Sequence, residues 1–219
     1  VSGGKTLSNA GNRNSLQTAE GRLATNAGMK HMNNLGYHDE DLMVRVSELL
    51  VATSDESDEM LDASITDVLR LLRDRMQMDV VFVSEFVDGR RVLRQVASDA
   101  DSPIQPGGSD PLEESWCQRV VDGRLPRFMP DAGREPAAAP LLQKLPFPIG
   151  THISTPVVLD DGQVYGTLCC FSFHPKDQPN PDDLARLQLT AQLAAKKLDL
   201  RRQKVRAPGS VPDWTLKGH

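Results

Sequence analysis

The sequence predicts an α+β fold, in which a mainly antiparallel sheet of about five to six strands carries helices on one face and a short helix plus a loop on the other. Two observations predict the sheet: Val- and Phe-rich stretches lie on both sides of Asp-Gly pairs at 88–89 and 161–162, as in hairpins. A third observation predicts the helices, because apolar residues recur at helical spacing near 39–76 and 180–204.

Two helices are predicted ahead of the first strand. The first runs from Asp39 to about Thr53, with apolar residues at Leu42, Val46, Leu49 and Leu50. The second runs from about Ser57 to Met76, and its apolar stripe consists of Leu61, Ile65, Val68, Leu69 and Leu72.

The first hairpin is predicted from 79–87 and 90–98. Strict alternation along the second of these strands places Val92 and Val96 on one face and Leu93 on the other. Residues 99–110 are rich in Gly, Pro, Ser and Asp, which predicts a loop.

The middle of the chain is predicted to be short elements and turns. Residues 112–121 form a short helix, which Asp122-Gly123 ends, and 127–129 form a short strand. Residues 132–148 are rich in Pro and Gly around one helix-like turn at 141–142, so we expect a mostly irregular loop.

A second hairpin, from 153–159 and 164–173, precedes a long final helix that Asn180 caps, with Pro181 at its first position. The first, second and last helices are expected on one face of the sheet. The short helix and the loop 132–148 are expected on the other.

Composition excludes several classes of protein. The 219 residues carry a net charge of −5, and no apolar run approaches the length of a membrane span. The first residues lack a basic stretch followed by an apolar core, so a secretion signal is not expected. The odd cysteine count argues against a disulfide framework, and a cytoplasmic protein is expected. We expect a weakly ordered segment 1–38, a domain 39–204 and a flexible tail 205–219.

Two stretches, ESWCQRVVDGRLPRFMPDA at 114–132 and GTHISTPVVLDDGQVYGTLCCFSF at 150–173, resemble those of a GAF domain. The resemblance covers about 57–200 and is greatest to the sensor domains that bacteria place ahead of cyclic-di-GMP phosphodiesterases and diguanylate cyclases. It implies a small-molecule pocket on the face of the sheet opposite the long helices.

The resemblance also implies the pocket residues. Alternation would turn one set of side chains of the last strand into the pocket, and residues of other elements would complete it. The candidates are Phe82, Trp116, Cys117, Asp131, Thr155, Tyr165, Thr167, Cys169 and Phe171. Asp131 follows a proline at the end of a strand, so a structural hydrogen bond to the loop backbone is favoured over a ligand contact.

The cysteines and histidines raise the possibility of thiol chemistry or of binding a metal, bilin or heme. Cys117 could be a redox-sensing or catalytic thiol, although a buried free cysteine is commoner. Cys169 and Cys170 should face opposite sides of the sheet, which argues against a shared metal site. The loop 133–149 lacks the cysteine that bilin-binding relatives use, so bilin is not expected. His152 and His174 are interpreted as strand-end or surface residues rather than heme or metal ligands.

No nucleotide-binding or catalytic motif was found, so we do not expect an enzyme. Acidic residues dominate 39–75 and basic residues dominate 196–206, which favours packing of the terminal helices and a homodimer. The predicted function is a regulatory sensor that binds a small molecule and signals to a partner protein or second subunit. The alternatives are a thiol-based redox sensor or reductase using Cys117, and a dimerisation module with an occluded pocket; nucleic acid is a weaker candidate partner.

Overall fold

The computed structural model describes residues 42, 44–48 and 58–206. The expected N-terminal segment 1–38 and most of the expected tail, residues 207–219, lie outside these residues. Part of the acidic stretch 39–75, from which packing of the terminal helices was predicted, also lies outside them, at residues 39–41, 43 and 49–57.

Six strands form one sheet in the described part of the chain: β1 (Val80–Val87), β2 (Arg90–Ala97), β3 (Ser109–Pro111), β4 (Phe128–Met129), β5 (His152–Val158) and β6 (Val164–Phe171). Their order is β3-β2-β1-β6-β5-β4, and every neighbouring pair is antiparallel. The predicted α+β class is therefore confirmed. The prediction of a loop at 99–110 missed β3, whose three residues pair with the start of β2.

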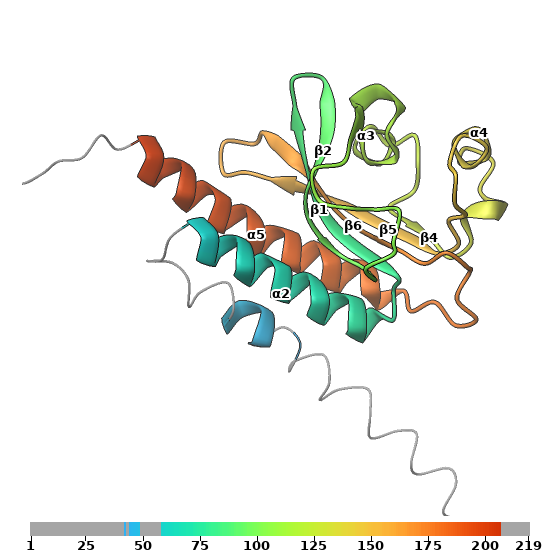
Figure 1. Ribbon diagram of the computed structural model, residues 1–219, viewed down its shortest axis with the longest axis horizontal. Coiled ribbons are helices and arrows are strands. Elements are labelled where there is room, and N and C mark those ends of the chain that lie inside the picture. Colours follow the sequence, from blue (N-terminus) through green and yellow to red (C-terminus); the bar gives the residue numbers. More distant parts are fainter. Residues whose placement is uncertain (1–41, 43, 49–57, 207–219) are drawn as a thin grey trace, which may run out of the picture. The chain divides into compact units, whose positions relative to one another are not determined.

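Helices cover both faces of the sheet, as predicted (Figure 1). The long helices α2 (Asp58–Met76) and α5 (Asp182–Arg206) lie side by side on one face. The other face carries short elements: η1 (Leu112–Glu114), α3 (Trp116–Val121), η2 (Ala132–Arg134) and α4 (Ala139–Leu142). Residues 42 and 44–48 are helical too, and Leu42 and Val46 are buried with the long helices.

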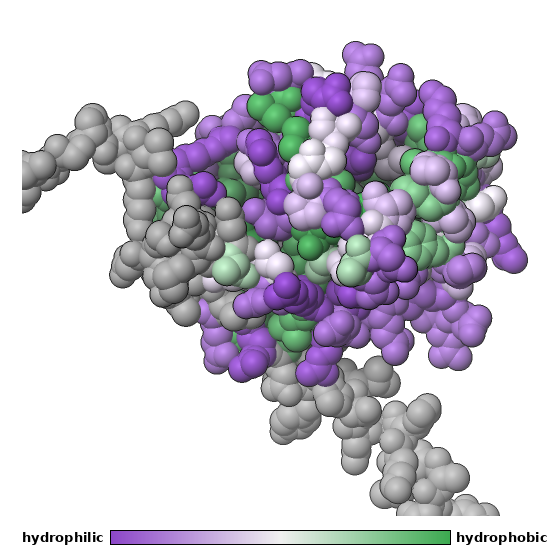
Figure 2. Space-filling model, viewed as in Figure 1, coloured by the Kyte–Doolittle hydropathy of each residue, from purple (hydrophilic) through white to green (hydrophobic). Residues whose placement is uncertain are grey.

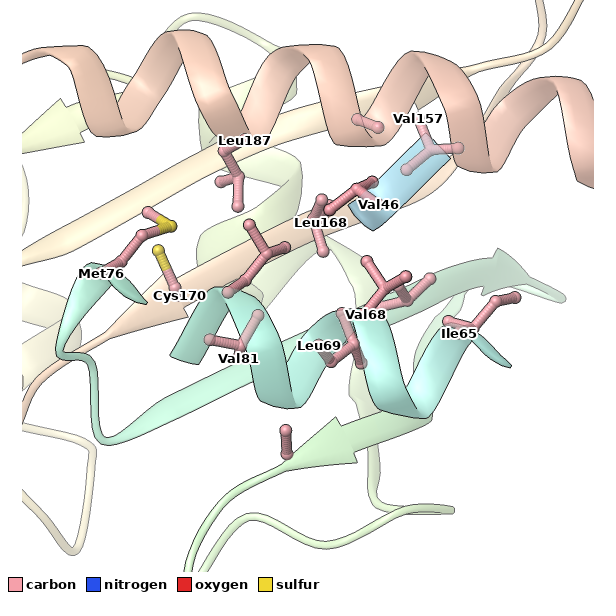
Figure 3. Close-up of a cluster of buried hydrophobic side chains, with 14 of the residues drawn as sticks. Val46, Ile65, Val68, Leu69, Met76, Val81, Val157, Leu168, Cys170 and Leu187 are labelled. Carbon is pink, nitrogen blue, oxygen red and sulfur yellow. The ribbon is translucent and has the colours of Figure 1, made fainter. Parts of the chain in front are cut away.

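The helix-side core is the cluster of buried side chains between the long helices and the sheet (Figure 3). Its members include Leu69 and Leu72 from α2, Val81 from β1, and Leu187 from α5. Almost all of it is hydrocarbon, and Cys170 points into it as a small hydrophobic side chain. Burial of this apolar surface is the main source of stability for the fold.

A hairpin turn that ends in Gly89 and a close strand contact at Gly166 both set the geometry of the sheet. Asp88 and Gly89 both have positive φ, at 50° and 70°, as a two-residue hairpin turn requires. At Gly166, a Cβ atom would lie 1.9 Å from the carbonyl oxygen of Ser84, so only glycine lets β6 approach β1 there.

Two bulges break the alternation on which the sequence predictions relied. In β2 the pairing passes from Gln95 to Leu93, which leaves Arg94 as the extra residue. Leu93 and Val96 consequently pack on the same face, contrary to the prediction that they face opposite sides. In β6 the pairing passes from Gly166 to Val164, which leaves Tyr165 as the extra residue.

The described helices include none that is both long enough and apolar enough to cross a membrane. On the face shown in Figure 2, hydrophobic side chains of the described residues appear in small groups among hydrophilic ones.

Candidate functional site

A small cavity lies between the sheet, α3 and the loop that leads into β5. It has a volume of about 40 Å³, enough for about three water molecules. Its walls are mostly apolar, with four polar or sulfur-bearing side chains among them. The lining consists of Phe82, Arg91, Leu93, Ile104, Trp116, Cys117, Leu145, Phe147, Ile149, His152 and Phe171.

The short helix α3 positions two of these residues. Ser115 caps it by accepting a hydrogen bond from the backbone N–H of Gln118, 3.1 Å away. The first turn of α3 then directs Trp116 and Cys117 against the sheet, where both are buried. The sequence therefore sets this wall of the cavity locally, through one serine cap.

Two polar atoms at the cavity are buried and have no hydrogen-bond partner within the protein. They are Nε1 of Trp116 and Nδ1 of His152. The two rings lie with centroids 5.2 Å apart, and the side chains are 6% and 2% exposed. Burial, aided by the positive charge of Arg91, lowers the pKa of His152 to about 3, so the imidazole is neutral at physiological pH.

Arg91 brings the only guanidinium among the residues that line the cavity. Its Nε donates to Asp110 Oδ1 at 3.0 Å, its Nη2 also pairs with Asp110, and its Nη1 lies 3.4 Å from Cys117 Sγ. Its Cζ atom sits 5.6 Å from the centre of the Phe82 ring, within the range of a cation–π contact. Arg91 thus joins the β2–β3 edge of the sheet to the thiol on α3.

Next to the cavity, and connected to it through Cys117, is a group of buried thiols and hydroxyls, which we call the thiol–hydroxyl network: Ser84, Cys117, Ser154, Thr167 and Cys169. Cys117 Sγ and Cys169 Sγ are 3.5 Å apart. Cys169 Sγ lies 2.8 Å from Ser154 Oγ and 3.2 Å from Thr167 Oγ1. Ser84 Oγ is 2.9 Å from Thr167 Oγ1 and 3.9 Å from Cys117 Sγ.

The two thiols of this network differ in acidity. Burial opposes ionisation of Cys117, but the hydrogen bond from Cys169 and the charge of Arg91 outweigh it and lower its pKa to about 5. Burial and the hydrogen bond with Cys117 raise the pKa of Cys169 well above its usual range. Of the two thiols, Cys117 is therefore the one whose surroundings favour the thiolate, and Cys169 is the one that they keep protonated.

The structure brings six of the nine predicted site residues together. Four line the cavity: Phe82, Trp116, Cys117 and Phe171. Thr167 and Cys169 lie next to it, in the thiol–hydroxyl network.

The other three predicted residues lie elsewhere. Tyr165 contacts the helix-side core, because the bulge in β6 reverses the alternation at that position. Thr155 pairs with Leu168 and shares its helix-side face, so it does not reach the cavity. Asp131 caps η2 by accepting a hydrogen bond from Gly133 N at 2.9 Å, the structural role that was favoured.

Sequence reasoning missed two of the residues that give the cavity its chemistry. His152 was interpreted as a strand-end or surface residue; it is the first residue of β5, but it is buried and faces the cavity. Arg91 was predicted only as part of the strand 90–98; in the structure its guanidinium bonds both Asp110 and Cys117. A half-buried Arg beside an Asp on the next strand leaves no short-range sequence pattern.

Metal ligation finds no support in the described part of the chain, where no group of three or more His, Cys, Asp or Glu side chains could hold an ion. Cys170 faces the opposite side of the sheet from Cys169, as expected from its position in the strand. His174 is exposed.

Comparison with known proteins agrees with this fold. The sequence matches the family model described as GAF domain over residues 54–199, which is two thirds of the 219 residues. The chain therefore belongs to the GAF domain family, whose members are typically sensory or regulatory modules. No protein of curated function matched the sequence.

Solved structures share the fold at low sequence identity. The GAF domain of an Acinetobacter phosphoenolpyruvate-protein phosphotransferase superposes with a TM-score of 0.61 at 16% identity, covering 80% of this chain and 99% of that one. Free methionine-R-sulfoxide reductase from Neisseria meningitidis gives 0.59 at 14% identity, with coverages of 76% and 91%. A putative GAF sensor protein from Burkholderia vietnamiensis gives 0.55 at 14%, with coverages of 76% and 94%. At these identities the likeness concerns the fold alone.

Proposed function

We propose that this chain is a non-enzymatic, intracellular sensor that binds a small molecule in the cavity beside α3. One observation carries the proposal: Trp116 Nε1 and His152 Nδ1 are both buried, both unpartnered and both on the cavity wall. An unsatisfied buried polar group costs about 1–3 kcal/mol, so a ligand that pairs with these atoms would recover that free energy.

The lining defines the class of ligand. The indole N–H can only donate, so the ligand must offer a hydrogen-bond acceptor to Trp116. The neutral imidazole of His152 can donate or accept, and the surrounding Phe82, Phe147 and Phe171 favour a flat or apolar portion. A compact heteroaromatic or carbonyl compound has these features. The cavity volume of about 40 Å³ is smaller than such a ligand, so binding requires the wall at 145–149 to move outward.

Signalling would follow from that movement. The segment 132–149 leads directly into β5, which packs against α5. A shift of this segment would therefore reach the long helices, and through them a second subunit or a separate output protein. Sensor domains ahead of cyclic-di-GMP enzymes, which the sequence resembles, would use their terminal helices in the same position.

A second candidate is a structural dimerisation module whose pocket is occluded. The small volume of the cavity favours it, because side chains of the chain itself already fill most of this space. The two candidates differ in one respect: only the sensor gains stability from a bound molecule.

Native mass spectrometry of protein purified from its own host tests the proposal. The sensor should carry a mass excess that disappears on denaturation. Trp116→Phe removes the indole donor and should weaken binding about tenfold, which lowers the occupied fraction. Trp214→Phe, the only other tryptophan and outside the described residues, is the matched control and should keep the excess. Wild-type protein without any excess would favour the occluded module instead.

A further inference from the structure

Two of the three cysteines are in contact, although 52 residues separate them in sequence. Cys117 comes from α3 and Cys169 from the middle of β6, so their approach is a product of the tertiary fold. The third, Cys170, lies on the opposite face of the sheet, within the helix-side core. The protein thus holds a dithiol pair and, one residue away, a thiol that serves as its internal control.

We propose that Cys117 and Cys169 form a reversible disulfide when a small hydroperoxide enters the cavity, which makes this pair an oxidation-sensitive site. The inference does not depend on the sensing function proposed above. It requires only the two sulfur atoms, the guanidinium beside them and the cavity that borders Cys117.

The geometry requires little movement. The sulfur atoms are 3.5 Å apart, and a disulfide bond is about 2.05 Å long, so they must approach by about 1.5 Å. Cys117 lies on α3, a helix of only six residues held by one serine cap, which can shift more readily than the central strand. Closure would draw α3 toward β6 and change the shape of the cavity above it.

Cys117 and Cys169 have surroundings that suit them to different steps of disulfide formation. Arg91 Nη1, 3.4 Å from Cys117 Sγ, stabilises the thiolate that attacks an oxidant. Cys169 keeps its proton, because burial and the neighbouring thiolate disfavour a second negative charge. Cys117 is therefore the residue that attacks the oxidant, and Cys169 is the resolving residue.

The cavity supplies space for the oxidant beside Cys117. Cys117 has no solvent-accessible surface, but its sulfur-bearing side chain is part of the cavity lining. Hydrogen peroxide has two oxygen atoms, and a cavity of about 40 Å³ that accommodates about three waters can hold it. A larger disulfide reagent would first have to displace the wall at 145–149.

Formation of the disulfide needs no reagent other than the hydroperoxide. The Cys117 thiolate attacks the terminal oxygen of the hydroperoxide, the O–O bond breaks, and the alkoxide or hydroxide released takes a proton from water. Cys117 becomes a sulfenic acid, oxidised by two electrons while the peroxide is reduced. The sulfur of Cys169 then attacks the sulfenic sulfur, and its thiol proton leaves with the hydroxyl group as water. A dithiol reductant restores both thiols by exchange.

Counting thiols in the whole chain tests this assignment. After treatment with hydrogen peroxide, denatured wild-type protein should lose two of its three thiols, and a digest should contain a peptide in which Cys117 is linked to Cys169. Cys170→Ser should lose both of its thiols in the same way. Cys169→Ser should stop at a Cys117 sulfenic acid, which dimedone traps. Three intact thiols in wild type, a link to Cys170, or a link between two chains would each overturn the proposal.

The proposed role of Arg91, stabilisation of the Cys117 thiolate, is tested by the pH dependence of a reaction rate rather than by the yield of disulfide. In a Cys170→Ser background, which keeps the hydrogen bond from Cys169, the alkylation located at Cys117 by digestion should have a nearly constant rate from pH 6 to 8, above the Cys117 pKa of about 5. Arg91→Gln should move the inflection upward, so that the rate rises about tenfold per pH unit in this range. Arg90→Gln, whose side chain bonds Ser109 instead, should leave the profile unchanged. A steeply rising profile without the Arg91 substitution would contradict the assignment.

Discussion

The two faces of the sheet differ in the chemistry of their side chains, although the same strands contribute residues to both faces. On the helix-side face, Val81, Val83 and Leu168 meet hydrocarbon from α2 and α5. On the cavity face, their neighbours Phe82, Ser84 and Cys169 meet thiols, hydroxyls and two unpartnered polar atoms. Cys169 and Cys170 show the contrast most directly, because adjacent residues with the same thiol face these two environments.

This difference shows how the domain separates stability from chemistry. Long helices with a continuous apolar stripe cover one face mainly with hydrocarbon, and burial of that hydrocarbon contributes favourably to the free energy of folding. The cavity face is covered by short helices and a Pro-rich loop, which bury less apolar surface and leave donors unsatisfied. Such groups reduce stability and are kept where a ligand or a reaction uses them.

The largest expected effect is on the helix-side face. Leu72 has no exposed surface, and Leu72→Ala should lower the free energy of unfolding by about 3–4 kcal/mol, through lost burial and the cavity left behind. Leu200→Ala, at a residue that is 47% exposed, is the matched control and should change it by less than about 0.5 kcal/mol. Urea unfolding followed by circular dichroism measures both. A loss below about 1 kcal/mol for Leu72→Ala would show that this face does not dominate stability.

The second effect comes from the cavity face and depends on pH. Because the pKa of His152 is about 3 in the folded chain and 6.5 ordinarily, the unfolded state takes up a proton first as pH falls. The stability present above pH 6.5 is therefore lost toward pH 3, by up to about 1.4 kcal/mol per pH unit. His152→Gln should remove the contribution of this histidine to the slope of the free energy of unfolding against pH.

Its control is His174→Gln, at an exposed histidine, which should leave the slope as in wild type. Protonation of Cys117 has the same sign, since its stabilising contribution is lost from pH 9 down to about 5. The difference between wild type and His152→Gln, measured from pH 6.5 to 4, isolates the histidine. Equal slopes in the two proteins would mean that His152 is not buried in neutral form.

The sequence was informative where local rules decide the structure. Helical periodicity placed α2 and α5, and Asp88-Gly89 placed the first hairpin, because spacing and turn chemistry act within a few residues. Alternation also placed Thr167, Cys169 and Phe171 on the cavity face. It failed at Tyr165 and Leu93, since a bulge inserts one residue and reverses every side chain beyond it.

The polar contacts of the site could not be predicted from the sequence, and the reason differs from the one for the bulges. Arg91 acts through Asp110 on β3 and Cys117 on α3, and His152 becomes buried only when α3 covers the start of β5. These contacts join residues that are 19, 26 and 36 positions apart in the sequence. No periodicity links them, so only the tertiary fold shows that the residues meet.

The smallest expected effect compares two adjacent residues of β1. Ser84→Ala removes the hydroxyl that lies 2.9 Å from Thr167 Oγ1, and should lower the free energy of unfolding by about 1 kcal/mol. Val83→Ala removes two buried methyl groups on the other face, and should cost about 2 kcal/mol, because each buried carbon contributes about 0.8 kcal/mol before the cavity term. Urea unfolding of both variants at one pH gives the order. If Ser84→Ala costs more, the thiol–hydroxyl network stabilises the domain as strongly as the hydrocarbon opposite, and the division between the two faces does not hold.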